Sequence, residues 1–226
     1  MQLLRKIDHF LHPGIGEVWM LHRVVREKSA IARYHRWEVT PEYLESHIQQ
    51  YIANGYQFVS MNEVLTTRKK FVAVTLDDGH LDNFTTALPI FEKYQIPFCV
   101  YITTGYVEGM VEARKEEHIP MMTKEQVVVL SQHPLCTIGS HTMTHPHLSC
   151  LTIEEQRREI LGAKLLLEEW TGKPVMHFAS PYGDYNQVTL DIVRESDISH
   201  VDIWGGPVRC NTHPYLIPRV EIIEKS

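Results

Sequence analysis

Short apolar runs alternate with longer amphipathic segments from one end of the chain to the other. Runs of about four to eight apolar residues fit strands, and segments of about ten to fifteen residues with one apolar face fit helices. Strands separated by helices of this length run parallel, so the pattern predicts an α/β fold with right-handed crossovers, either open or rolled into a barrel. The expected strands cover residues 17–21, 57–59, 71–76, 98–102, 136–138, 175–179, 200–203 and 219–223.

Capping residues indicate where the expected helices begin. Thr40 is followed by a proline, which is favoured at the first position of a helix. Thr123 with Gln126, and Thr152 with Glu155, have the spacing of a capping box. Helices are therefore expected over residues 41–53, 87–94, 124–132, 153–170 and 187–195.

At 226 residues the chain is long enough for one α/β domain with a sizeable core, and we expect a single domain over residues 1–226. Ligands of such folds bind beyond the carboxyl ends of the parallel strands. Polar residues follow four of the expected strands directly, and the pattern predicts that they converge: His22, Asp77, Asp78, His141, Pro181 and Tyr182.

Charge and hydropathy exclude some classes of protein. The formal net charge is -6, and the sequence has no stripe of Lys and Arg to replace the counterions of a phosphate backbone, so a nucleic-acid binder is not expected. No run approaches the roughly 18 to 20 apolar residues of a membrane span. The first residues lack the long apolar segment of a secretory signal, so a cytoplasmic location is expected.

Asp77 and Asp78 stand side by side at the end of the apolar run 71–76. A turn with a helix cap would explain them, because Asp and the Gly79 that follows both favour such positions. The functional interpretation depends on the two aspartates being consecutive in the sequence. Successive side chains point apart, so one carboxylate could bind a metal while its neighbour acts as a base.

His141 and His145 form the second polar group, after the run 136–138. On a helical turn, residues four apart present both imidazoles on one side, a geometry suited to metal binding. The alternative is a polar surface turn capped by Ser140. Together with the Asp pair, these donors suit zinc or another divalent first-row ion, and they favour a metal-dependent hydrolase.

Three motifs in this order and spacing resemble the polysaccharide deacetylases, carbohydrate esterase family four. They are Thr-Leu-Asp-Asp-Gly at residues 75–79, Ser-His-Thr-Met-Thr-His-Pro at 140–146 and Phe-Ala-Ser-Pro-Tyr-Gly at 178–183. The resemblance spans about residues 17–223. It implies that the fold is a distorted (β/α) barrel.

The same resemblance implies a role for each motif residue. Asp77 would be the general base, and a backbone N–H near Tyr182 would stabilise the oxyanion, with Pro181 also at the substrate. Three protein ligands leave an open position for water, whose pKa the ion lowers toward about 7. The metal is expected to be zinc, with cobalt or nickel as alternatives, and its ligands would be Asp78, His141 and His145.

The general acid is the first departure from the family. Most members carry its histidine in a Leu-x-His motif near the C-terminus, and this chain has none there. The segment Trp-Met-Leu-His-Arg-Val at residues 19–24 instead resembles the N-terminal strand of a permuted subgroup, which includes the poly-N-acetylglucosamine deacetylases of biofilms. We assign the acid to His22 on this basis; the alternative is a histidine satisfied at a strand end.

The third motif also lacks the arginine that holds the base aspartate in many relatives. Arg219, entering the last expected strand, is the candidate to replace it. An always-charged guanidinium would keep Asp77 ionised and oriented. Trp204 could stack on a sugar ring or pack in the core, and His80 and His147 could line the cleft.

These features predict a metal-dependent enzyme that removes N-acetyl groups from an amino sugar in a polysaccharide, oligosaccharide or lipid-linked glycan. The expected partner is therefore an N-acetylated saccharide. Deformylation or O-deacetylation of a sugar would use the same attack by water. A non-catalytic carbohydrate-binding protein on the same scaffold is a further alternative, against which the retained Asp77 argues.

Overall fold

The computed structural model of the protein describes residues 15–107, 109 and 119–225. Its main sheet has eight strands, all paired in parallel, in the order β10-β1-β5-β6-β7-β8-β9 with β4 beside β5. The strands are β1 (Gly16–Leu21), β4 (Gln57–Phe58), β5 (Phe71–Leu76), β6 (Phe98–Ile102), β7 (Cys136–Ser140), β8 (His177–Ala179), β9 (Ser199–Val201) and β10 (Val220–Glu221). The predicted parallel α/β fold is confirmed.

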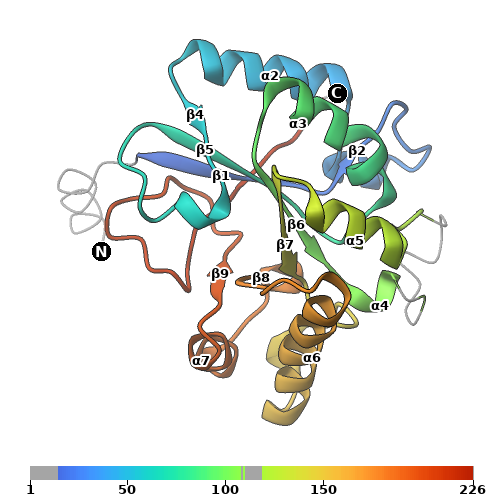
Figure 1. The fold of residues 1–226 in the computed structure, drawn as a ribbon, viewed down its shortest axis with the longest axis vertical. Coiled ribbons are helices and arrows are strands. Elements are labelled where there is room, and N and C mark those ends of the chain that lie inside the picture. Colours follow the sequence, from blue (N-terminus) through green and yellow to red (C-terminus); the bar gives the residue numbers. More distant parts are fainter. Residues whose placement is uncertain (1–14, 108, 110–118, 226) are drawn as a thin grey trace.

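The sheet curls until its two edges are joined by one stretch of chain. Ile217 forms a parallel β-bridge with Val201, the last residue of β9. β10, which begins three residues after Ile217, pairs with β1. The N–H of Asp202 donates to the carbonyl of Ile217 at 2.7 Å. Residues 217–221 therefore close a distorted (β/α) barrel, around which the helices lie at the periphery (Figure 1).

The helices begin where their capping residues predicted. The side chains of Thr40, Thr123 and Thr152 accept from the N–H groups of Tyr43, Gln126 and Glu155. The helices are α2 (Pro41–Ala53), α3 (Leu88–Tyr94), α4 (Thr104–Val107), α5 (Lys124–Gln132), α6 (Ile153–Thr171) and α7 (Gln187–Glu195). A small separate sheet pairs β2 (Arg23–Val24) with β3 (Glu38–Val39), and the 3-10 helix η1 (Ala32–Trp37) lies between them in the sequence.

Alternate strand residues supply two different cores, as the two-residue period of a strand requires. From β5, Val72 and Val74 pack with the helices, in the same cluster as Leu44 of α2. Phe71 and Ala73 belong instead to a second cluster, with residues of β8 and β9 from across the sheet. The second cluster fills the barrel interior below the carboxyl ends of the strands.

Gly139 of β7 lies inside this interior, and its replacement tests the packing. A Cβ atom at this position would lie 2.4 Å from Cδ1 of the Tyr101 ring, which is fully buried. Gly139→Ala is expected to lower the free energy of unfolding by about 1–3 kcal/mol, the usual cost of overpacking. Urea denaturation measures it. Gly205→Ala, whose nearest neighbouring atom is 4.0 Å away, is the matched control and should have little effect.

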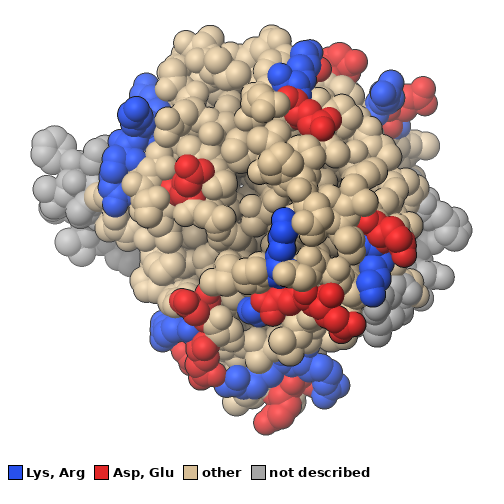
Figure 2. Space-filling model, viewed as in Figure 1, with Lys and Arg blue, Asp and Glu red and all other residues tan. Residues whose placement is uncertain are grey.

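The surface gives two further observations. Within the described part of the chain, no helix combines the length and apolarity needed to cross a membrane. On the face shown in Figure 2, basic and acidic side chains are interspersed over most of the surface, with one short group of basic side chains at the upper left edge.

Candidate active site

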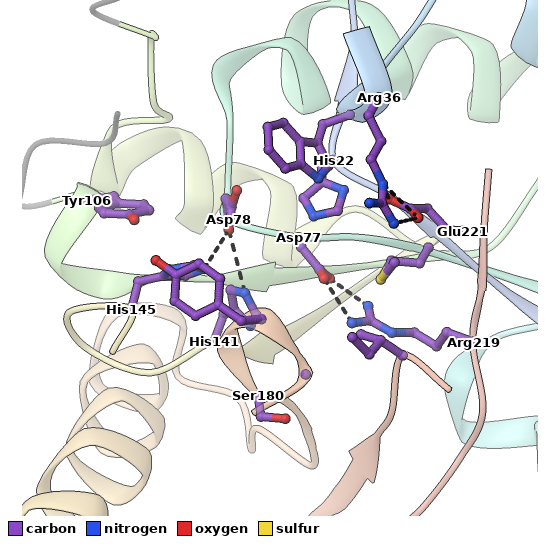
Figure 3. A pocket seen from close by; sticks show the side chains of 15 residues that line it. His22, Arg36, Asp77, Asp78, Tyr106, His141, His145, Ser180, Arg219 and Glu221 are labelled. Atoms are coloured by element: carbon purple, nitrogen blue, oxygen red, sulfur yellow. Dashed lines mark hydrogen bonds and ion pairs between the residues drawn. The ribbon is translucent and has the colours of Figure 1, made fainter. Parts of the chain in front are cut away.

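The carboxyl ends of four strands surround a cavity of about 560 Å³. His22 follows β1, Asp77 and Asp78 follow β5, His141 follows β7, and Ser180 follows β8. Figure 3 shows these side chains around one space. Five of the six residues predicted to converge at the carboxyl ends line this cavity, and Pro181 does not. The cavity is lined by Met20, His22, Arg36, Trp37, Asp77, Asp78, Tyr106, His141, His145, Ser180, Tyr182, Gly183, Ile203, Arg219 and Glu221.

The two adjacent carboxylates point in different directions. The backbone of Asp78 is left-handed, with φ 74°, a conformation that Asp tolerates better than most residues. Gly79 continues at φ 89°. The side chain of Asp77 contacts Arg219, whereas that of Asp78 faces His141 and His145 (Figure 3). The turn after β5 thus separates the two carboxylates into different environments.

One side of the cavity holds three potential metal-binding atoms. Asp78 Oδ1 lies 3.5 Å from Nε2 of His141 and 3.3 Å from Nε2 of His145. These distances exceed the roughly 2.7–2.9 Å of a charge-assisted hydrogen bond. Two ligands of a tetrahedral zinc ion, each about 2.0–2.2 Å from it, are about 3.4 Å apart. The two distances from Asp78 match this spacing, and all three donor atoms lie within 4.8 Å of one another, so they could hold a metal ion.

The orientation of two of these donors is fixed by a second hydrogen bond. Nδ1 of His141 donates to the carbonyl of Ala179 at 2.8 Å, which leaves Nε2 with its lone pair toward Asp78. Burial lowers the pKa of His141 to about 4, so the imidazole is neutral, as a ligand must be. Oδ2 of Asp78 interacts with Nε2 of His80 at 3.1 Å, leaving Oδ1 toward the other donors.

The predicted helical turn at His141 and His145 is wrong. Residues 141–147 form an irregular loop, in which Thr142 and His145 have left-handed φ values of 67° and 60°. Glu159 of α6 accepts from the N–H groups of Met143 and Thr144, at 2.9 and 2.8 Å, and so replaces the hydrogen bonds that a helix would supply. The imidazoles converge through this loop rather than through helical periodicity.

Asp77 is held by Arg219 in a two-pronged ion pair. The guanidinium donates to both carboxylate oxygens, at 2.7 and 2.9 Å, and both residues are buried. Burial alone would raise the pKa of Asp77, but Arg219, followed by His141, outweighs it, so the pKa lies below its ordinary value. Arg219 also donates to the hydroxyl of Thr75, at 3.2 Å, and lies 5.5 Å from the centre of the Tyr101 ring.

Of the three residues predicted to contact the sugar, one lines the cavity and two do not. Tyr182 lines the cavity and packs edge-on against His145, with ring centres 4.6 Å apart. Pro181 is buried and is not among the lining residues. Trp204 is 71% exposed, so the core-packing alternative is wrong; it lines a separate hollow of about 310 Å³, next to Ile203 of the main cavity.

Some lining residues were not expected from the sequence. Trp37 and Arg36 come from η1, and Arg36 makes an ion pair with Glu221 at 2.6 Å on the rim. No motif marks them, since they reach the cavity only because η1 lies over the end of β1. His80 and His147, which the sequence suggested for the cleft, are not among the lining residues; His80 contacts Asp78 instead. His147 lies flat against the ring of Tyr182, with centres 4.1 Å apart.

With this geometry established, the family can be stated. The polysaccharide deacetylase family model matches residues 65–201, more than half of the chain, and the chain belongs to this family. The match includes Asp77, Asp78, His141, His145 and Tyr182. It does not extend to His22 or Arg219, which lie before and after it.

Particular relatives make the resemblance more specific. The chain is 30% identical over 153 residues to the Bacillus subtilis strain 168 protein YxkH, which is named for the same family; this covers 65% of the chain and 51% of YxkH. The chain thus spans about half the length of that relative. It is 23% identical over 205 residues to the poly-beta-1,6-N-acetyl-D-glucosamine N-deacetylase of Staphylococcus aureus strain MRSA252, covering 84% of the chain and 69% of the relative.

Among solved structures, IcaB from Ammonifex degensii has the same fold. The TM-score is 0.78, the identity is 23%, and the alignment covers 92% of each chain. The distorted barrel predicted from the motifs is therefore confirmed at the level of the fold.

Proposed function

We propose that the protein is a metal-dependent N-deacetylase of amino sugars in a polysaccharide or oligosaccharide. The observation that carries the proposal is the ion pair of Asp77 with Arg219, directly beside three donor atoms that lie within 4.8 Å of one another and could hold a metal ion. A protein that only bound carbohydrate would have no use for a buried, ionised carboxylate next to a second one. This arrangement argues for catalysis.

Zinc is the ion that we propose, and Asp78 Oδ1 with Nε2 of His141 and of His145 would hold it. When bound, the ion supplies Lewis acidity to the acyl carbonyl and lowers the pKa of a water molecule. Asp77 is the general base and takes a proton from the attacking water at a carboxylate oxygen. Arg219 keeps this carboxylate ionised and in place.

The leaving amine requires a proton, and His22 is the residue that we propose to donate it. His22 lines the cavity near Asp77 and Asp78, with its ring directed into the space between them (Figure 3). Its ring centre is 6.3 Å from that of Trp37. Proton donation to the amine nitrogen allows the C–N bond to break.

The substrate class is supported by the relatives and by the cavity wall. The Staphylococcus aureus relative is named for poly-beta-1,6-N-acetyl-D-glucosamine. Trp37, Tyr106 and Tyr182 line the cavity, and Tyr182 is 57% exposed. Aromatic faces of this kind are apolar surfaces against which sugar rings can pack. We therefore propose an N-acetylglucosamine polymer or oligomer as the substrate, with the exposed Trp204 as a further contact.

Metal content and acetate release together test the function. We expect one equivalent of divalent metal per chain and metal-dependent acetate release from β-1,6-linked N-acetylglucosamine oligomers, lost with a chelator and restored by zinc. Release from O-acetylated sugars alone would assign the alternative esterase activity, and formate release from formamido sugars the deformylase. A folded protein that binds no zinc, cobalt or nickel would contradict the proposal.

Loss of one proposed ligand should remove the metal. His145→Ala is expected to weaken zinc binding by at least about 100-fold, because even residues that only orient a ligand are worth 10- to 100-fold. Isothermal titration of the metal-free protein with zinc measures this. His147→Ala, two residues away and 59% exposed at its side chain, is the control and should keep its affinity. Equal affinity of both variants would exclude His145 as a ligand.

A further inference from the structure

The residues that follow the Asp pair hold the strand end that carries His22. Nδ2 of Asn83 donates to the backbone carbonyl of His22 at 2.8 Å, and Asn83 is fully buried. The contact joins residues 61 positions apart in the sequence. An amide buried in this way stabilises the structure only while its partner is in place, because an unpaired donor would pay the desolvation cost alone.

Asp82 holds the next residues of the same segment. Its Oδ1 accepts from the N–H of Val24 at 3.1 Å, and its Oδ2 accepts from Nε of Arg23 at 2.9 Å. Arg23 is held from a second direction by Glu38 of β3, at 2.6 Å. One carboxylate thus holds the two residues after His22, Arg23 through its side chain and Val24 through its backbone.

The third contact lies on the other side of His22. The N–H of Asp77 donates to the carbonyl of Leu21 at 2.9 Å. Residues 77–83 therefore contact the chain on both sides of His22, at Leu21, Arg23 and Val24, and the carbonyl of His22 itself. The same seven-residue stretch carries the proposed base and one proposed metal ligand, so the position of His22 is tied to theirs through a short, rigid path.

Asn83 and Asp82 together form a clamp on the segment around His22, and neither of them can act on the substrate itself. Asn83 and Asp82 are absent from the lining of the active-site cavity, and Asp82 instead borders a different hollow with Arg23 and Val24. Their hydrogen bonds reach the backbone around His22. An effect of these residues on protonation of the amine would therefore act through the position of the imidazole.

We infer that Asn83 and Asp82 are positioning residues, which set the place of the His22 imidazole relative to Asp77 and Asp78. The inference rests on the proposed function, in which His22 protonates the leaving amine. The pairing of β1 with β5 ends at Leu21, and β2, which follows His22, pairs with β3 and not with β5. The clamp extends this order beyond the strand end.

The test compares an amide with an ester substrate. An amine leaves only when it is protonated, whereas the nitrophenolate of 4-nitrophenyl acetate leaves without a proton. For Asn83→Ala we expect kcat on N-acetylglucosamine oligomers to fall by about 10- to 100-fold, as a displacement of about 1 Å can cause. We expect KM and zinc content to be unchanged and ester hydrolysis to stay near wild type. Asn54→Ala, which removes another 2.8 Å amide-to-carbonyl bond, is the matched control.

The double variant His22→Ala/Asn83→Ala should be no slower on the amide than His22→Ala alone, because the clamp acts only through His22. Equal losses on amide and ester, or an additive loss in the double variant, would overturn the inference. Wild-type protein without amide activity would instead refute the proposed function.

Two further measurements keep the inference testable in either case. The imidazole NMR signals of His22, assigned by their absence in His22→Ala, should shift in Asn83→Ala and not in Asn54→Ala; unshifted signals would refute the clamp without reference to turnover. If Asn83→Ala does not fold, Asp82→Ala serves, since that side chain is 13% exposed and Arg23 keeps Glu38. It should show the same amide-selective loss.

Discussion

Asp77→Asn is expected to lower kcat for acetate release by about 10³-fold or more while zinc remains bound. The amide has the shape of the carboxylate but cannot take a proton from water, and general base catalysis contributes about 10²- to 10⁴-fold. The metal should remain because its proposed ligands are Asp78, His141 and His145, and Asp77 points toward Arg219 instead. Acetate release and metal content on the same preparation measure both effects.

A matched control separates chemistry from folding. Asp184→Asn changes a partly exposed carboxylate that accepts from the N–H and the hydroxyl of Ser149, and it lies outside the cavity lining. It should retain wild-type turnover. An Asp77→Asn variant with more than a tenth of wild-type activity would show that Asp77 is not the base. Loss of zinc in that variant would show that the two carboxylates have been assigned the wrong roles.

Arg219→Met should have two separable effects, one on stability and one on the pH profile. Removing one partner of a buried ion pair leaves the other charge unpaired, which costs about 3–5 kcal/mol. The pKa of Asp77 should rise, since Arg219 is what outweighs the effect of burial. The acid limb of the kcat/KM profile is therefore expected to move to higher pH, which an activity series across pH measures.

The sign of the stability effect follows from the depressed pKa. In the wild type, the lowered pKa of Asp77 contributes stability above the ordinary value of about 3.9, and this is lost as the pH falls through the lower folded value. Arg219→Met should remove this pH dependence of the stability. Asp77→Asn/Arg219→Met should be more stable than Arg219→Met alone, because no charge is left buried. Arg157→Met, which breaks the exposed pair with Glu195, should change stability little. An unshifted acid limb would contradict the role of Arg219.

The elements that were predicted well depend on local signals. The capping boxes at Thr123 and Thr152 specify the helix starts through contacts only three residues long. The strand end at Asp77 follows from the apolar run before it. The contact between Asp77 and Arg219 was also predicted, from the family resemblance, because many relatives hold this aspartate with an arginine of the third motif that is missing here.

What could not be predicted depends on contacts between distant segments. The loop that carries His145 takes its shape from Glu159 on α6, and no pattern in residues 141–147 indicates that partner. Trp37 and Arg36 reach the cavity because of how η1 lies beside β1. The contact of Asn83 with His22 depends on the register of β1 against β5, which hydrophobic periodicity leaves open.

The closure of the barrel by residues 217–221 has a consequence for synthesis. During translation, Asp77 emerges 142 residues before the arginine that will neutralise it. A growing chain can therefore form the turn after β5 and the histidine loop while the space for Arg219 is still open to water. Asp77 can become paired with Arg219 only when this closing segment has been made, so the environment of the carboxylate is completed late in the synthesis of the domain.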